Sequence, residues 1–394
     1  MLFQTPELDT VDLAVIGQID QFRNTMRFAL REPRRWTGQL RRNLLAKAIQ
    51  GSNSIEGYDV TDEDAVAAVE EEEPLTADEA TWAEIRGYRS AMSYVLQLAD
   101  DPDFSLDQTL IRSLHYMMLS HDLSKSPGRY RSKPVFVVDE ARGRVVYEGP
   151  EAEIVPELTE ELVQAIRKDT DGPSFVRAAM AHLNLVMIHP FRDGNGRMAR
   201  CLQTLILARE QIVAPEFSSV EEFLGRSTPD YYAILAAVGA GSWNPGNDAT
   251  PWVKFILRAH HIQAQVVVRR LKEASAIWSE LDSIATEKGL PERSVAALFD
   301  ASLGLRLRRS NYIKLTDVED RTATRDLQAM TDAGLLVAKG ERRGRVYAAA
   351  EPLLHIRRSV RSSQPGIVDP YGDISSLLRN QSAREPELPL EWNL

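Results

Sequence analysis

One twelve-residue segment, from His189 to Arg200, constrains this chain more than any other feature. It lies between two stretches, 175–188 and 197–207, whose apolar residues follow helical spacing. Pro190 cannot continue a helix and sends the chain into a loop directly after His189. The segment therefore predicts two buried helices joined by a loop, with the imidazole of His189 held at the end of a stiff element and facing a cavity.

The residues of this loop suit phosphate chemistry. An imidazole titrates near neutral pH, so His189 could accept a proton from an attacking hydroxyl. Asp193 offers a single carboxylate, which suits Mg²⁺ because this ion takes one or two carboxylates and completes its shell with substrate oxygens and water. The turn Gly194-Asn195-Gly196 allows backbone N–H groups to converge on an anion, next to the positive end of the following helix.

Two arginines complete the segment. Arg197 and Arg200 are three residues apart on the first turn of the second helix, so both could reach the same ligand. A histidine at a helix end is by itself usually a core residue, and a Gly-Asn-Gly turn is common. The combination at this spacing is what predicts transfer of a nucleotide phosphate group.

Residues 189–200 resemble the signature of the Fic (filamentation-induced) family, His-x-Phe-x-(Asp/Glu)-Gly-Asn-Gly-Arg-x-x-Arg, at every defined position. The resemblance implies a mainly α-helical fold with a Fic-type core. It also implies transfer of AMP from ATP to a Ser, Thr or Tyr hydroxyl of a target protein or of the chain itself, with Mg²⁺ as cofactor.

The family pattern assigns roles to the residues of the segment. His189 would be the catalytic base, Phe191 would anchor the loop in the core, and Asp193 would hold Mg²⁺ against the α- and β-phosphates. The nucleotide-binding residues would be Gly194, Asn195 and Gly196, which form the anion hole, Arg197, which supports the phosphates and the loop, and Arg200, which binds the γ-phosphate.

Upstream of the segment, a β-hairpin is predicted. Two β-branched runs, 133–138 and 144–149, flank a polar turn at 139–143. In family members a hairpin here is a flap that pairs with the backbone of the target, as strand addition would allow. A plain structural hairpin is the alternative.

Downstream of the segment, residues 229–235 and 252–257 resemble later core helices of the family, where a tyrosine often borders the adenine. Tyr231 or Tyr232 would be that residue and would bind the nucleotide. Aromatic residues at helical spacing are also common in hydrophobic cores.

A second family motif lies near the N-terminus. After a helical pattern at 36–48, Ser52-x-x-x-Glu56-Gly57 resembles the inhibitory motif (Ser/Thr)-x-x-x-Glu-(Gly/Asn). The resemblance implies that the Glu56 carboxylate pairs bidentately with Arg200 and occupies the space of the γ-phosphate. Ser52 and Glu56 could instead cap a helix, or Glu56 could position a water that removes AMP from a modified protein.

Composition sets wider limits. With 394 residues and 43% hydrophobic content, the chain can bury more than one core. The single cysteine, Cys201, excludes a disulfide framework and is expected in the core. We expect a soluble, cytoplasmic protein without a membrane partner, because no long apolar run is present.

The net charge of −10 argues against nucleic-acid binding over the whole surface. Much of the negative charge is local, at 62–64 and 70–73, and we expect these residues to form a solvated face and a turn.

The expected division of the chain is an N-terminal helical region with the inhibitory helix (1–104), the Fic core (105–260), a helical linker (261–290), a winged-helix domain (291–360) and an irregular tail (361–394).

The winged-helix prediction depends on two short helical patterns, 311–320 and 321–330, followed by a hairpin around 340–344. In such a domain the second helix enters the major groove and a basic wing contacts phosphate. The DNA-facing residues would be Thr322, Thr324, Arg325 and Gln328, and the wing would contribute Arg342, Arg343 and Arg345. Winged helices also dock proteins or form homodimers. A nucleotide-sensing DNA-binding regulator, which binds ATP without transferring AMP, is therefore an alternative function.

Overall fold

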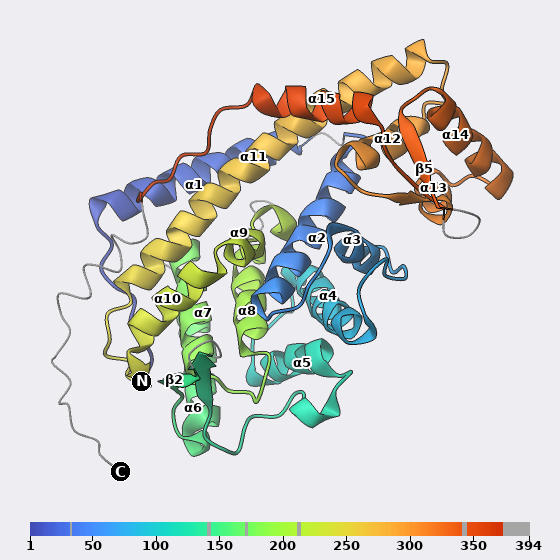
Figure 1. The fold of residues 1–394 in the computed structure, drawn as a ribbon. Coiled ribbons are helices and arrows are strands. Elements are labelled where there is room, and N and C mark those ends of the chain that lie inside the picture. Colours follow the sequence, from blue (N-terminus) through green and yellow to red (C-terminus); the bar gives the residue numbers. More distant parts are fainter. Residues whose placement is uncertain (32–33, 140–142, 170–171, 211–213, 341–344, 373–394) are drawn as a thin grey trace.

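The fold is mainly helical, as predicted. A computed structural model describes residues 1–31, 34–139, 143–169, 172–210, 214–340 and 345–372 (Figure 1). The N-terminal region consists of α1 (Thr10–Ala29), α2 (Thr37–Ile55), α3 (Asp62–Val69) and α4 (Glu79–Ala99). The side chains of Asp9, Thr61 and Asp78 accept backbone N–H groups at the starts of α1, α3 and α4, which fixes where these helices begin.

The middle of the chain contains α5 (Gln108–Leu119), β1 (Phe136–Asp139), β2 (Arg144–Glu148), α6 (Val155–Lys168), α7 (Ser174–Ile188), α8 (Asn195–Ala208), α9 (Glu221–Arg226), α10 (Thr228–Gly239), β3 (Gly241–Ser242) and the long α11 (Thr250–Glu287). Strands β1 and β2 pair antiparallel, so the predicted hairpin is confirmed, although residues 140–142 of its turn lie outside the described part. Strand β3 pairs parallel to β2 and was not predicted.

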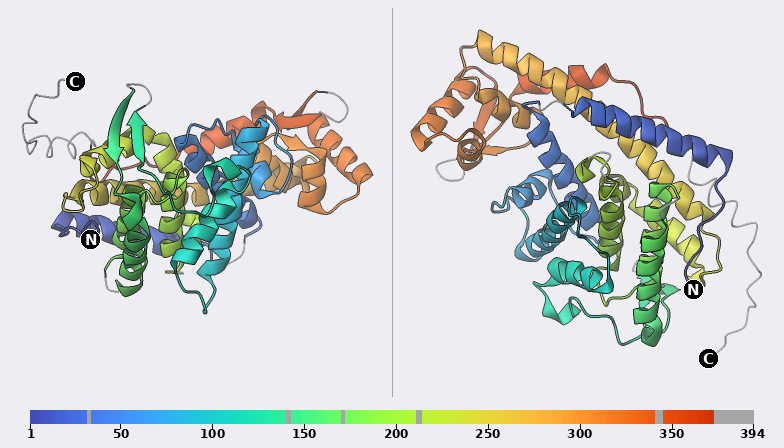
Figure 2. Two further views of the ribbon diagram at one scale, coloured as in Figure 1. Left: turned by 90° about the horizontal axis from the view of Figure 1, so that it is seen from below. Right: turned by 180° about the vertical axis from the view of Figure 1, so that it is seen from behind.

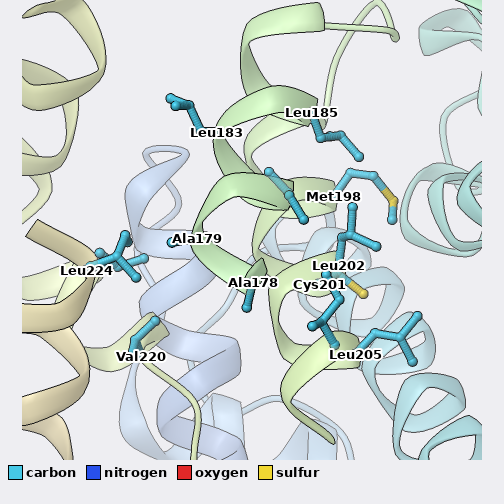
Figure 3. Close-up of a cluster of buried hydrophobic side chains, with 14 of the residues drawn as sticks. Ala178, Ala179, Leu183, Leu185, Met198, Cys201, Leu202, Leu205, Val220 and Leu224 are labelled. Atoms are coloured by element: carbon cyan, nitrogen blue, oxygen red, sulfur yellow. The ribbon is translucent and has the colours of Figure 1, made fainter. Parts of the chain in front are cut away.

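Helices α7 and α8 are the centre of the first hydrophobic core. Nearly every residue of both helices is buried, so neither has a solvent face. Figure 3 shows Leu183 and Leu185 of α7 and Met198, Leu202 and Leu205 of α8 in this cluster. Cys201 is fully buried among them, as expected, and burial raises the pKa of its thiol. The loop between the two helices is thus held at both ends by packed helices.

The linker expected at 261–290 is helical up to Glu287, but it is part of a longer helix and not a separate element. Helix α11 runs without a break from Thr250 to Glu287, so it begins inside the expected core region. The reason is a continuous buried face: Trp252 and Phe255 belong to the first core, and Ile277 and Leu281 belong to a second one. Helix α1 lies along α11 in all views (Figures 1 and 2).

The C-terminal region surrounds the second core. It contains α12 (Ser294–Ser302), β4 (Leu307–Arg308), α13 (Arg309–Thr316), α14 (Asp320–Asp332), β5 (Leu336–Lys339), β6 (Val346–Ala349) and α15 (Glu351–Ser362). The strands form one sheet in the order β4-β6-β5. The expected helix at 311–320 instead ends at Thr316, because Asp317 adopts a left-handed conformation with φ 52°. Identification of the region as a winged helix stays a prediction.

Helix α2 spans both cores. Trp36, just before the helix, and Leu40 and Leu44 in its first half are buried in the second core, and Ile49 and Ile55 in its second half are buried in the first. In Figure 1, α2 runs from the C-terminal helices toward α8. The same helix thus contacts the C-terminal region at one end and α8 at the other.

Only part of the acidic segments forms the expected solvated face and turn: residues 62, 71 and 73 are exposed, and the chain turns at 70–71. Asp64 is fully buried and accepts hydrogen bonds from Leu75 and Thr76. Other acidic side chains bind the C-terminal region: Glu63 pairs with Arg306, and Glu72 pairs with Lys314. Negative charge here is complementary to basic residues that lie far away in sequence.

The first part of the expected irregular tail is docked on the body of the protein. Residues 361–362 still belong to α15, whereas Asp369 pairs with Arg258 at 2.7 Å and the Tyr371 hydroxyl donates to Asp12 at 2.6 Å. Residues 373–394 lie outside the described part. Within the described ranges, no helix combines the length and apolar character that crossing a membrane requires.

Candidate active site

His189 lies at the C-terminal cap of α7 in a left-handed conformation, with φ 51°. Its Nδ1 is 3.0 Å from the Val186 carbonyl oxygen. Because a carbonyl only accepts, Nδ1 must carry the proton, and Nε2 keeps a free lone pair. Burial lowers the pKa of His189 below its usual 6.5, so the imidazole is neutral at pH 7. These are the properties that a general base needs.

Three side chains hold the loop after His189. Phe191 is fully buried and stacks on His115, with ring centroids 3.7 Å apart. The His115 ring lies 2.9 Å from the Asp193 carbonyl oxygen, and burial lowers the pKa of His115 to about 4. The Asn195 side chain accepts from the Phe191 N–H and donates to the Phe191 carbonyl, both at 2.9 Å. Asn195 therefore closes the loop, and its backbone N–H, not its amide, would be available to an anion.

Arg131 connects this loop to the hairpin. It is buried, its Nε donates to the His189 carbonyl at 2.8 Å and its Nη2 donates to the Pro150 carbonyl at 2.6 Å. Tyr147 of β2 adds a bond from its hydroxyl to the Met187 carbonyl at 2.8 Å. The base of the hairpin is thus fixed to the residues that orient His189.

Asp193 belongs to a cluster of four charges. Its carboxylate accepts from Lys125 Nζ at 2.9 Å, and Lys125 also donates to Glu84 at 2.7 Å. Glu84, on α4, forms an ion pair with the buried Arg197. Burial raises the pKa of Glu84, but Arg197 and Lys125 outweigh this effect and hold it at about 2. The ion pair with Glu84 thus holds the Arg197 guanidinium in place.

The cluster is compatible with Mg²⁺. Asp193 has a half-exposed carboxylate, whose pKa is held below its usual range because Lys125 and Arg197 outweigh the effect of burial. No set of three or more ligating side chains is present among the described residues, so substrate oxygens and water would have to complete the coordination shell. When bound, the ion would neutralise phosphate charge.

Arg200 is buried and its guanidinium is held by α2. Its Nε donates to Ser52 Oγ at 2.8 Å, and its Nη2 donates to the Ser52 carbonyl at 3.0 Å and to Glu56 Oε1 at 2.6 Å. The expected bidentate pair with Glu56 is therefore wrong: one hydrogen bond joins them, and Ser52 takes the others. Among the described residues, Arg200 Nη1 has no hydrogen-bond partner.

Gly196 provides the space that Glu56 occupies. A Cβ at Gly196 would lie 2.7 Å from Glu56 Oε1 and 3.1 Å from Arg200 Nη1. The Glu56 carboxylate therefore reaches the N-terminal turn of α8, where an anion is favoured by the helix dipole. It stands where the sequence motif predicts a phosphate.

The two tyrosines of α10 differ in how far they are exposed. Tyr231 is 1% exposed, and its hydroxyl lies 3.0 Å from Nε2 of the buried His182, so it is a core residue and not a surface on which a base could stack. Tyr232 is 46% exposed and donates to the Ile55 carbonyl at 3.1 Å, next to the end of α2. Of the pair, only Tyr232 has a face available to a ligand.

The structure thus brings together residues predicted from two separate motifs: Ser52 and Glu56 contact Arg200 and Gly196, and Glu56 and Asp193 are electrostatic neighbours of His189. Sequence reasoning missed Glu84, Lys125, His115 and Arg131. A signal existed for Glu84, because it lies on the same buried face of α4 as Tyr88, Ala91 and Val95. A charged residue in an apolar stripe indicates a buried ion pair.

Comparison with known proteins agrees with this geometry. The Fic/DOC family profile matches residues 105–207. A protein named protein adenylyltransferase Fic from Nematostella vectensis is 27% identical over 263 residues, which are 64% of this chain and 55% of that protein. Protein adenylyltransferase fic-1 from Caenorhabditis elegans is 29% identical over 198 residues, which are 49% of this chain and 35% of that protein. The match thus spans about half or less of these relatives.

Solved structures share the fold. A Fic family protein from Desulfovibrio desulfuricans G20 superposes with a TM-score of 0.57 at 22% identity, over 88% of this chain and 98% of that one. Residues 134–508 of Fic-1 from C. elegans superpose with a TM-score of 0.53 at 21% identity, over 66% of this chain and 73% of that one. The similarity to the Fic/DOC family is thus shown for residues 105–207, the region that its profile matches.

Proposed function

We propose that this chain is an autoinhibited protein adenylyltransferase, which transfers AMP from ATP to a side-chain hydroxyl of a target protein or of itself. The observation that carries the proposal is the combination of a neutral His189, whose Nδ1 contacts the Val186 carbonyl, with the N-terminal turn of α8, where Gly196 leaves space for an anion next to Arg200. The names of the relatives, protein adenylyltransferases, support the same reaction.

In this proposal each group has one task. Nε2 of His189 takes the proton of the attacking hydroxyl, and that oxygen forms a bond to the α-phosphorus while pyrophosphate leaves. The N–H groups at the start of α8 and Arg197 stabilise the phosphates. Asp193 would hold Mg²⁺, and Arg200 would bind the γ-phosphate.

Inhibition follows from competition for Arg200. Glu56 and Ser52 occupy its Nε and Nη2 donors, and the Glu56 carboxylate fills the space at Gly196 next to Nη1, so the γ-phosphate would have to displace this carboxylate. ATP would then bind weakly or in a bent pose that is unsuitable for attack.

Intact-mass spectrometry tests the reaction. The purified chain is incubated with Mg²⁺ and, separately, ATP, GTP, CTP and UTP. We expect addition of one or more AMP groups with ATP, more slowly for the wild type than for a Glu56→Gly variant. Absence of any nucleotide adduct in both proteins, together with measurable ATP binding, would favour the nucleotide-sensing alternative.

The pH dependence of transfer is expected to follow His189. Because burial lowers its pKa, the base stays neutral to pH values below 6.5 and loses its function only when it is protonated there. The acid limb of the rate of Glu56→Gly should therefore have its midpoint below 6.5. Asp193, whose pKa is also held low, adds no limb near neutrality. A midpoint at or above 6.5 would contradict this environment for His189.

A close helix crossing is expected to position the inhibitory residues. A Cβ at Gly51 would lie 2.2 Å from the Glu221 carbonyl oxygen of α9, which cannot move away as a side-chain end can. Gly51→Ala should push α2 from α9, destabilise the protein by about 1–3 kcal/mol and raise self-modification. Gly38→Ala, on the same helix with nothing within 4 Å, is the matched control. Urea unfolding and AMP incorporation measure both effects, and equal values for the two variants would refute the positioning.

The C-terminal region has one feature that favours DNA binding. Thr324, Arg325 and Gln328 are exposed along α14, whereas Thr322 is half-buried. Arg345 is exposed too, and Arg342 and Arg343 lie outside the described residues. The logarithm of the DNA-binding constant falls linearly with the logarithm of the salt concentration. If α14 enters a major groove, Arg325→Gln should reduce the magnitude of this salt slope by about one. Arg358→Gln on α15 should leave the slope unchanged. Salt-independent binding, or none to a DNA library, would assign the region to protein contacts or to a homodimer.

A further inference from the structure

A cavity of about 240 Å³ lies where α2 meets the C-terminal region, away from His189. It lies between α2, α3, α9, α11, α12 and α15, and its apolar wall includes Leu40 and Leu44 of α2 and Phe299 of α12. A water molecule takes a share of about 30 Å³ in the liquid. The cavity therefore has room for a small organic molecule.

The polar part of the wall is positively charged. Five basic and two acidic side chains line the cavity: Lys47, Arg226, Arg270, Arg357 and Arg361, against Asp62 and Glu273. The buried Glu222 behind this wall pairs with Arg226 and Arg270. Positive charge remains in excess when Glu222 is included, so an anion is favoured over a cation or a neutral molecule.

Arg357 is the basic residue whose charge is least compensated. It is half-buried, its Nη1 donates to the Leu303 carbonyl at 2.8 Å, and no ion pair of the described residues includes it. Burial and the neighbouring Arg361 lower its pKa. A guanidinium without a carboxylate partner at the edge of a cavity is suited to bind a carboxylate or a phosphate.

We propose that this cavity binds a small amphipathic anion, a phosphate or carboxylate carried on an aromatic or aliphatic body. The anionic group contacts Arg357, and the body packs against Leu40, Leu44 and Phe299. A ligand with only the anionic group, or only the apolar body, would make only part of these contacts. Binding therefore depends on both charge and apolar surface.

A ligand in the cavity should change the activity of the active site, and this step rests on the proposed autoinhibition. Residues 40–50 of α2 form one wall of the cavity, in the conformation in which Glu56, just after the last residue of this helix, accepts a hydrogen bond from Arg200. A ligand stabilises the conformation that it fits. The anion should therefore strengthen inhibition and slow self-modification.

Binding is tested first, on the full chain without nucleotide. Phenyl phosphate and octanoate are the probes, and inorganic phosphate and benzyl alcohol separate charge from apolar body. Calorimetry should show saturable binding of at least one probe, weakened about tenfold or more by Arg357→Gln and abolished by Ala274→Phe, which fills the cavity. Arg358→Gln, an exposed neighbour on the same helix, should bind as the wild type does.

The outcomes are distinct. If neither probe saturates at millimolar concentration, if Arg357→Gln and Ala274→Phe bind normally while folded, or if inorganic phosphate binds equally well, the site is refuted. The regulatory step predicts slower self-modification of the wild type and no change for Glu56→Gly. A bound probe without effect on the wild type refutes that step. If binding is intact and neither protein incorporates AMP, the adenylyltransferase proposal fails and the anion site stands.

Discussion

Glu56→Gly is expected to raise self-modification and to tighten productive ATP binding. The reason is the bond between Arg200 Nη2 and Glu56 Oε1, which uses a donor that the γ-phosphate requires. Couplings of this kind are commonly about 1–3 kcal/mol, so the expected gain in apparent affinity is roughly 5–150-fold. Titration of ATP against the rate of AMP incorporation measures both quantities.

The control for this effect is the double variant with Arg200→Ala. If Glu56 acts through Arg200, the gain from Glu56→Gly disappears when the arginine is absent, as a double-mutant cycle requires. A gain that persists would indicate general loosening of α2. Equal or lower activity in a folded Glu56→Gly protein would instead favour the reverse reaction, in which Glu56 positions a water that removes AMP.

His189→Ala is expected to reduce transfer by about 10²–10⁴-fold, because loss of a general base typically costs this much. ATP binding should be retained, since Nε2 acts on the hydroxyl and not on the nucleotide. The test is made in the Glu56→Gly background, where the rate is high enough to measure the loss.

His115→Gln is the informative comparison. His115 stacks on Phe191 and bonds the loop, but its low pKa and burial leave it without a role in proton transfer. The His115→Gln variant should hold the loop less firmly and bind the nucleotide more weakly. The decrease of the transfer rate at acid pH should remain. A His189→Ala variant that transfers AMP at the parental rate would contradict the assignment of the base.

The central loop could be predicted from sequence because its chemistry is local. His189, Asp193 and Gly196 are fixed by a helix end, a proline and a turn within a few residues. The inhibitory contact could be predicted only through resemblance, since Glu56 and Arg200 meet across 144 positions of the chain. Its geometry, in which Ser52 binds Nε and shares Nη2 of Arg200 with Glu56, depends on the packing of α2.

Other errors have a common cause. Glu63 and Glu72 were expected in solvent because their partners, Arg306 and Lys314, lie in another region of the chain. The sequence predicts a separate linker within α11 because charged residues interrupt the hydrophobic pattern of this helix, although one of its faces is buried along the whole length. The local spacing of apolar residues predicts which helices and strands form. It does not predict which surfaces from distant parts of the sequence are complementary.

The central claim is that Glu56 excludes ATP by occupying Arg200. Calorimetric titration of ATP with Mg²⁺ into His189→Ala and into His189→Ala/Glu56→Gly tests it most directly, because neither protein consumes the nucleotide. The account predicts binding that is roughly 5–150-fold tighter in the second protein. Equal affinity of the two folded proteins for ATP would contradict it.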